Sequence, residues 1–183
     1  DMIMLYSEDS LEVQNQPYFG YMRARYTEAE MKEIDDYAYE LGIEVIPCIQ
    51  TLAHMPDPLR WNVFRPIKDY AECLLVGNDK TYEFLRDLII SATRPLRSKR
   101  IHIGMDEAHD IGLGRYLNIH GYENRFEIMQ KHLQRVVEIC EKYGMKPMIW
   151  SDMFFRLCTG GGYYGYNFEF PEGLKESVPD VQL

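Results

Sequence analysis

Four short apolar runs, separated by helix-like segments, constrain the fold of this chain more than any other feature. The runs cover residues 2–6, 43–49, 100–105 and 145–150. Short continuous apolar runs of this kind are typical of parallel strands that are buried on both faces. The connections between them are long enough for right-handed crossovers. We therefore expect a β-α-β-α-β-α-β order and a parallel sheet.

Three segments, one in each interval between consecutive apolar runs, have helical periodicity. The first begins after Thr27, the expected N-cap, with Glu30 at the capping-box position. The second opens at Asn78 or Asp79 and ends before Pro95, and the third spans residues 123–143. Loops are predicted for the proline-bearing section at about 55–77, around Gly112 and Gly114, and beyond residue 151.

Each predicted strand leads into a polar segment that is suited to a functional site. These segments are Glu8-Asp9, His54, Asp106-Glu107, and Trp150 with Asp152. An open sheet binds ligands at one crevice, whereas a barrel places its site on the loops that follow several strands. The absence of a glycine-rich phosphate motif after any strand also argues against a nucleotide-binding sheet.

We therefore expect an α/β fold of the (β/α)8 TIM-barrel type. Four strands are half of such a barrel, and a closed barrel takes about 250 residues, against the 183 of this chain. The prediction for residues 1–183 is a partial catalytic barrel domain, and we expect it to be cut from a longer protein rather than completed by another chain. Exposed edge strands would then favour self-association through the missing barrel strands.

The segment from His102 to His109 places two adjacent carboxylates at the end of the third apolar run. Strand alternation turns His102, Gly104 and Asp106 to one side, and Ile101, Ile103 and Met105 to the other. Glu107 can join Asp106 only if the strand is already turning into its loop. The spacing therefore predicts a functional site that contains Asp106 and Glu107 at the end of this strand.

This segment resembles the signature of glycoside hydrolase family 20, the β-N-acetylhexosaminidases, whose pattern is His-x-Gly-x-Asp-Glu. All four positions match: His102, Gly104, Asp106 and Glu107. The resemblance covers nearly the whole chain, from about the second barrel strand to just past the fifth. Met105 and the run at 112–116 are most similar to a bacterial branch of N-acetylglucosaminidases.

The resemblance also implies supporting roles for residues at the other strand ends. Asp9 matches an acid that positions a histidine, His54 matches that histidine, and Trp150 matches an aromatic wall of the sugar pocket. Asp152 is expected either to bind substrate or to cap the next segment. A departure is Gln50, where the family often has an acid.

The implied reaction removes a terminal non-reducing β-linked N-acetylhexosamine with retention of configuration. The substrate assists its own cleavage, since its acetamido oxygen attacks the anomeric carbon. Asp106 would orient the acetamido group. Glu107 would act as acid and then as base, with its proton supported by an Asp9–His54 relay. Such a reaction needs no cofactor and no metal, and the partners are glycans ending in N-acetylglucosamine or N-acetylgalactosamine.

Two other functions remain open from the residues alone. His102, Asp106, Glu107 and His109 are also suitable ligands for zinc or manganese in a metal-dependent hydrolase. The other alternative is a carbohydrate-binding or purely structural fragment without catalysis. Retained activity after chelation would exclude the first, and release of nitrophenol from an aryl N-acetylglucosaminide would exclude the second.

Composition argues against some classes of binding partner and indicates where the protein is located. A net charge of −9 and a pI near 5.1 argue against nucleic acid. No apolar run approaches the length of a membrane span, and no signal peptide is visible. The four cysteines form no close pair and have apolar neighbours, so we expect buried free thiols and favour a cytoplasmic location.

Several aromatic and histidine side chains allow a structural as well as a functional interpretation. Trp150 either packs in the core or lines the pocket, and Trp61 either reaches a sugar or anchors its loop. His102 is expected to be structural, and His109, His120 and His132 to lie on the surface. The tyrosines that follow the triple glycine belong to a predicted loop: Tyr163, Tyr164 and Tyr166.

Overall fold

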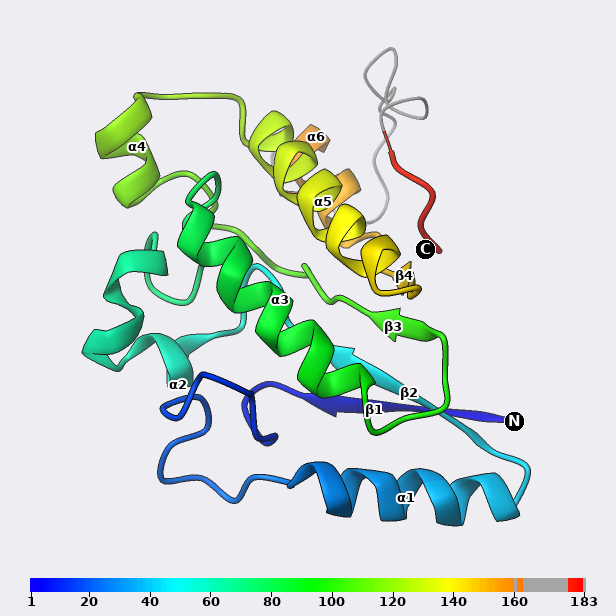
Figure 1. The fold of residues 1–183 in the computed structure, drawn as a ribbon. Coiled ribbons are helices and arrows are strands. Elements are labelled where there is room, and N and C mark those ends of the chain that lie inside the picture. Colours follow the sequence, from blue (N-terminus) through cyan, green and yellow to red (C-terminus); the bar gives the residue numbers. More distant parts are fainter. Residues whose placement is uncertain (160, 163–177, 183) are drawn as a thin grey trace.

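The computed structural model describes residues 1–159, 161–162 and 178–182, and it contains the predicted parallel sheet (Figure 1). The strands are β1 (Met2–Ser7), β2 (Glu44–Ile49), β3 (Arg100–His102) and β4 (Lys146–Met148). They lie in the order β1-β2-β3-β4, and each neighbouring pair is parallel. All four carboxyl ends therefore meet at one edge of the sheet.

The sheet continues past β4 through one isolated bridge. Gln182 pairs with Met148 in parallel, and the backbone N–H of Ile149 donates to the carbonyl of Gln182 over 2.9 Å. A fifth parallel position thus follows β4 in both sequence and space. This progression, with each new strand added beside the last, is the order of a TIM barrel, and the chain folds as part of one.

The main crossover helices are α1 (Glu28–Glu40), α3 (Asp79–Thr93) and α5 (Arg125–Lys142). Helices α3 and α5 pack side by side over the sheet, and α1 contacts β2 (Figure 1). Ile101, Ile103 and Met105, the three residues predicted to face helices, are fully buried. The predicted capping box of α1 is confirmed, because Thr27 and Glu30 bond each other's backbone N–H.

Short helices occupy three segments that the sequence predicted as loops. These are α2 (Pro56–Leu59) with the 3-10 helix η1 (Asn62–Ile67), α4 (Arg115–His120), and α6 (Asp152–Thr159). The third and fourth strands are also shorter than predicted, since β3 ends at His102 and β4 at Met148. Tyr163, Tyr164 and Tyr166 lie outside the described residues.

The prediction that His132 lies on the surface is wrong, because the residue is fully buried. Its Nε2 lies 2.8 Å from the carbonyl of Thr51, and its Nδ1 lies 3.3 Å from the hydroxyl of Tyr82. Burial lowers the pKa of His132 to about 4. The neutral ring thus ties α5 to α3 and to the segment that follows β2. His109 and His120 are exposed, as expected.

The cysteine prediction holds for three of the four thiols. Cys48, Cys73 and Cys140 are free and buried, and Cys158 is half-buried. Trp61 packs against the main core and meets the ring of Tyr21 edge-on at 5.2 Å, so it anchors its loop. Within the described part of the chain, no helix combines the length and apolar character that crossing a membrane requires.

Candidate active site

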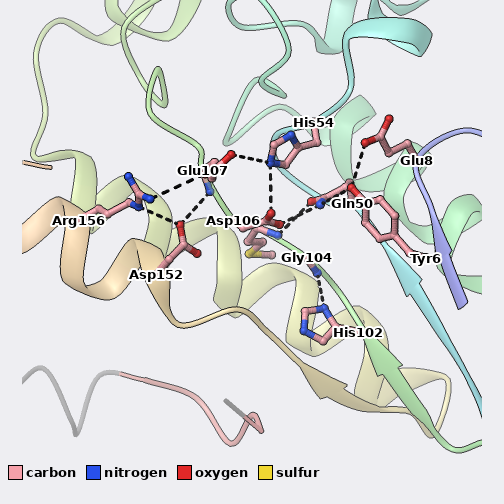
Figure 2. A network of polar contacts seen from close by, with 11 residues as sticks. Tyr6, Glu8, Gln50, His54, His102, Gly104, Asp106, Glu107, Asp152 and Arg156 are labelled. Carbon is pink, nitrogen blue, oxygen red and sulfur yellow. Dashed lines mark hydrogen bonds and ion pairs between the residues drawn. The ribbon is translucent and has the colours of Figure 1, made fainter. Parts of the chain in front are cut away.

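A left-handed turn follows β3 and presents the two predicted catalytic acids together. Gly104, Met105 and Glu107 have φ angles of 70°, 68° and 51°, a region that residues other than glycine adopt rarely. Strict alternation past His102 would separate Asp106 from Glu107. The turn instead brings both carboxylates within reach of one histidine, as Figure 2 shows.

Gly104 is needed in this turn for two separate reasons. Its φ of 70° favours glycine. In addition, a Cβ atom at this position would lie 2.2 Å from Oε1 of Gln50 and 2.7 Å from the carbonyl oxygen of Ile49. The backbone of the turn therefore lies directly against the end of β2, which sets the distance between the two loops.

Gln50, directly after β2, holds Asp106 in place (Figure 2). Its Oε1 accepts the backbone N–H of Met105 over 3.3 Å, which turns its Nε2 toward the site. That nitrogen donates to Oδ1 of Asp106 over 2.9 Å and to the hydroxyl of Tyr6 over 3.2 Å. Because the amide can only donate here, Asp106 Oδ1 is an acceptor. An acid at position 50 could not do the same unless it were protonated.

His54 connects the two acids. Its Nε2 lies 3.2 Å from Oδ2 of Asp106 and 3.7 Å from Oε2 of Glu107. The Asp106 side chain is 25% exposed and that of Glu107 is 52% exposed. Asp106 thus has a nitrogen atom of Gln50 near one oxygen and of His54 near the other, whereas Glu107 is the more accessible acid. This asymmetry suits an orienting role for Asp106 and a proton-transfer role for Glu107.

Asp152 begins α6 and binds the backbone of Glu107. Its Oδ2 accepts the Glu107 N–H over 3.1 Å and lies 3.4 Å from Nε of Arg156. Burial raises the pKa of Asp152, and the bond from Glu107 opposes that shift. Asp152 is therefore the first residue of α6 and also holds the turn that carries Asp106 and Glu107.

Asp9 does not contact His54 in this structure, so the expected Asp9–His54 relay is not formed among the described residues. Asp9 is buried and lies 3.4 Å from the guanidinium of Arg23, which also pairs with Asp57 over 2.8 Å. Burial raises the pKa of Asp9, and Arg23 opposes that shift. The acid that follows β1 instead joins its own loop to α2.

Trp150 follows β4 and lies against His102. The two ring centroids are 4.4 Å apart, and the indole is 43% exposed. Nδ1 of His102 accepts the Gly104 N–H over 3.1 Å, and burial lowers the pKa of the ring. His102 is therefore structural, as expected. Trp150 presents an accessible aromatic face at the carboxyl end of the sheet.

Asp69 joins the loops after β2 and β3 to each other. It is 9% exposed, and its two oxygens accept the backbone N–H groups of Gly112 and Tyr116 over 3.1 and 2.7 Å. Sequence reasoning gave Asp69, Tyr6 and Arg156 no role. The only available signals were the position of Tyr6 at a strand end and the four-residue spacing of Arg156 from Asp152.

The metal-dependent alternative finds no support in the arrangement of donors. Across residues 1–159, 161–162 and 178–182, no group of three or more His, Cys, Asp and Glu side chains could hold a metal ion. Of the four candidate metal ligands, His102 contacts Gly104 and Trp150, and His109 is exposed. Only Asp106 and Glu107 converge, and they do so on His54.

Parallel strands that deliver an acid pair to one edge of the sheet, beside a histidine, are an arrangement by which barrel enzymes carry out acid–base chemistry. Comparison with known proteins makes the assignment specific. The model of the glycosyl hydrolase family 20 catalytic domain matches residues 6–159, so the chain belongs to that family.

Among curated proteins, human hexosaminidase D is 27% identical over 152 residues, which are 75% of this chain and 31% of that protein. A β-hexosaminidase of Streptomyces plicatus, solved with the product GlcNAc, has a TM-score of 0.66 and 23% identity over 82% of this chain. A β-N-acetylhexosaminidase of Bacteroides fragilis has a TM-score of 0.68 and 20% identity over 90%. This chain spans about a third of each relative's length, 31%, 33% and 36% respectively.

Proposed function

We propose that the protein to which this chain belongs is an exo-β-N-acetylhexosaminidase that removes a terminal N-acetylglucosamine or N-acetylgalactosamine from glycans. The observation that carries the proposal is the convergence of Asp106 and Glu107 on His54 at the carboxyl ends of the strands. Family membership supports the same reaction, and the Streptomyces relative binds GlcNAc as its product.

Adjacent carboxylates cannot easily flank a glycosidic bond as the acid and the nucleophile of a two-carboxylate retaining enzyme, which lie about 5 Å apart across that bond. A substrate-assisted reaction removes this requirement, because the acetamido oxygen is the nucleophile. Asp106, an acceptor held by Gln50 and His54, would receive the acetamido N–H and orient that group. The result is an oxazolinium intermediate bound beside Asp106.

Glu107 would protonate the departing glycosidic oxygen and later deprotonate the incoming water. Its side chain is accessible, so it can reach the leaving group. Trp150 would supply an apolar face for the sugar, and His54 would fix the spacing of the two acids. Asp9 would act at a distance, by ordering the loop that carries Arg23.

The test is hydrolysis of p-nitrophenyl N-acetyl-β-glucosaminide and its trifluoroacetamido analogue by the full-length protein. Fluorination weakens the acetamido oxygen as a nucleophile, so we expect the analogue to react at least about 100-fold more slowly. Equal rates for the two substrates would contradict substrate assistance, and no hydrolysis of any N-acetylhexosaminide would contradict the proposed function.

Substitution of the acids separates their roles. Glu107→Gln should lower kcat by about 10²–10⁴-fold on aryl substrates while product binding is retained. Asp106→Asn should lower the rate mainly by losing control of the acetamido group. Glu127→Gln, an exposed change on α5, is the matched control and should leave the rate unchanged. A Glu107→Gln protein with the wild-type rate would exclude Glu107 as the acid.

A further inference from the structure

Arg156 on α6 is a charged residue beside the acid pair to which neither the sequence nor the family comparison gave a role. Its Nη2 lies 3.8 Å from Oε1 of Glu107, and its Nε lies 3.4 Å from Oδ2 of Asp152. Asp152 in turn accepts the backbone N–H of Glu107. Figure 2 shows that Arg156, Asp152 and Glu107 each contact the other two, on the side of Glu107 away from His54.

We propose that Asp152 and Arg156 are positioning residues for Glu107, and that Arg156 stabilises the carboxylate left when Glu107 gives its proton to the leaving group. This inference rests on the proposed function. It assigns α6, the helix after β4, a direct part in the acid step of the reaction.

The backbone contact explains how Glu107 keeps its unusual conformation. Glu107 has a φ of 51° and is not glycine, so the turn is strained there. A bond from its N–H to the Asp152 carboxylate is charge-assisted and offsets part of that strain. Asp152 is only 14% exposed, and a charge at such a site is stabilised by a nearby cation. Arg156, one helical turn further along, is that cation.

The charged groups that face Glu107 come from three segments. His54 approaches Oε2 from the loop after β2, Asp106 lies on the same turn, and Asp152 and Arg156 come from α6. Asp106 and Asp152 disfavour a negative charge on Glu107, whereas Arg156 favours it. Removing Arg156 therefore leaves the Glu107 carboxylate with two negative neighbours and without the cation from α6.

This balance of charges around Glu107 affects the first half of the reaction, in which the glycosidic bond breaks. The acetamido oxygen bonds to the anomeric carbon, the bond from that carbon to the glycosidic oxygen breaks, and the proton of Glu107 moves to the departing oxygen. Glu107 becomes a carboxylate at that moment, beside the guanidinium of Arg156. In the second half, the oxygen of a water molecule bonds to the anomeric carbon, the bond from that carbon to the acetamido oxygen breaks, and the water gives a proton back to Glu107.

The experiment measures kcat/KM, which reports the first half, for Arg156→Gln across aryl N-acetyl-β-glucosaminides whose leaving groups differ in acidity. We expect a loss of about tenfold or more for a poor leaving group, which needs the proton, and less than about threefold for dinitrophenol, which does not.

Arg156→Lys keeps the charge and should restore most of the rate on the poor leaving group, and it is measured in place of Arg156→Gln if that variant does not fold. Arg86→Gln, which breaks a similar arginine–aspartate pair on α3, is the control and should change the rate for neither leaving group. An equal loss for all leaving groups, or no loss at all, would overturn the proposal. If the wild type hydrolyses none of these substrates, the proposed function itself fails.

Discussion

Gly104→Ala tests the claim that contact between the turn after β3 and the end of β2 builds the site. At position 104, two effects of the alanine both lower the free energy of unfolding. A left-handed alanine costs about 1–2 kcal/mol, partly offset by about 0.4–1 kcal/mol because alanine is also less free in the unfolded chain. The second cost comes from the new methyl group, which would lie 2.2 Å from Oε1 of Gln50 and 2.7 Å from the carbonyl oxygen of Ile49.

The Ile49 oxygen belongs to a buried strand and cannot move away cheaply, so the turn itself must move to relieve that contact, and the Gln50 side chain must shift to relieve the other. Its Oε1 then loses the N–H of Met105, and a buried donor left without a partner costs about 1–3 kcal/mol. We therefore expect Gly104→Ala to lower the free energy of unfolding by about 2–4 kcal/mol. The rate should also fall by more than the loss of folded protein explains, because Asp106 loses its donor.

Gly144→Ala is a matched control for the backbone cost. Gly144 has the same φ of 70°, and nothing lies within 4 Å of the position of its missing Cβ. Urea unfolding of both variants, followed by fluorescence, should show about 1 kcal/mol for Gly144→Ala and a clearly larger loss for Gly104→Ala. Equal losses to within about 0.5 kcal/mol would refute the steric argument.

Three further predictions follow from buried polar groups. Because burial lowers the pKa of His132 to about 4, its neutral form favours folding; the wild type should lose stability as the pH falls from about 6.5 to 4, by at most about 3 kcal/mol. His132→Gln should lack this part of the slope in urea unfolding at pH 7 and pH 5. Gln50→Leu should lower kcat on the nitrophenyl substrate by about tenfold or more, since Asp106 is no longer held; an unchanged kcat would contradict that role. Asp69→Ala should free the loop after β3 and speed its cleavage in limited proteolysis, because Gly112 and Tyr116 lose their acceptor; an unchanged cleavage rate would count against the loop contact.

Local sequence was enough to predict the strands and the three long helices, because their apolar periodicity and caps are contained within each segment. The short helices were missed because helices of four to eight residues are marginal on their own. Contacts from elsewhere accompany them: Asp69 binds the first turn of α4, and Asp152 at the start of α6 binds Glu107. No neighbouring residue in the sequence carries that information.

His132 shows the reverse case, in which the signal was present and misinterpreted. It lies on the same stripe of α5 as Ile128, Met129, Leu133 and Val136, all of them buried. Its polar neighbours in sequence, Lys131 and Gln134, lie on other faces of the helix. The spacing, rather than the polarity of adjacent residues, was the better guide. A buried histidine at this position then needed two partners, and Thr51 and Tyr82 supply them.

The relative placement of the Asp106 and Glu107 carboxylates could not be predicted from the sequence alone. Asp106 and Glu107 are neighbours, and in an extended strand neighbours point to opposite faces. They converge because the chain becomes left-handed at Gly104, Met105 and Glu107. In the sequence, only Gly104 indicates this left-handed conformation. The other two conformations are held by Gln50, which binds the Met105 N–H, and by Asp152, which binds that of Glu107. The acid pair therefore depends on β2 and α6 as much as on its own strand, so damage to either contact should impair catalysis even when both carboxylates remain.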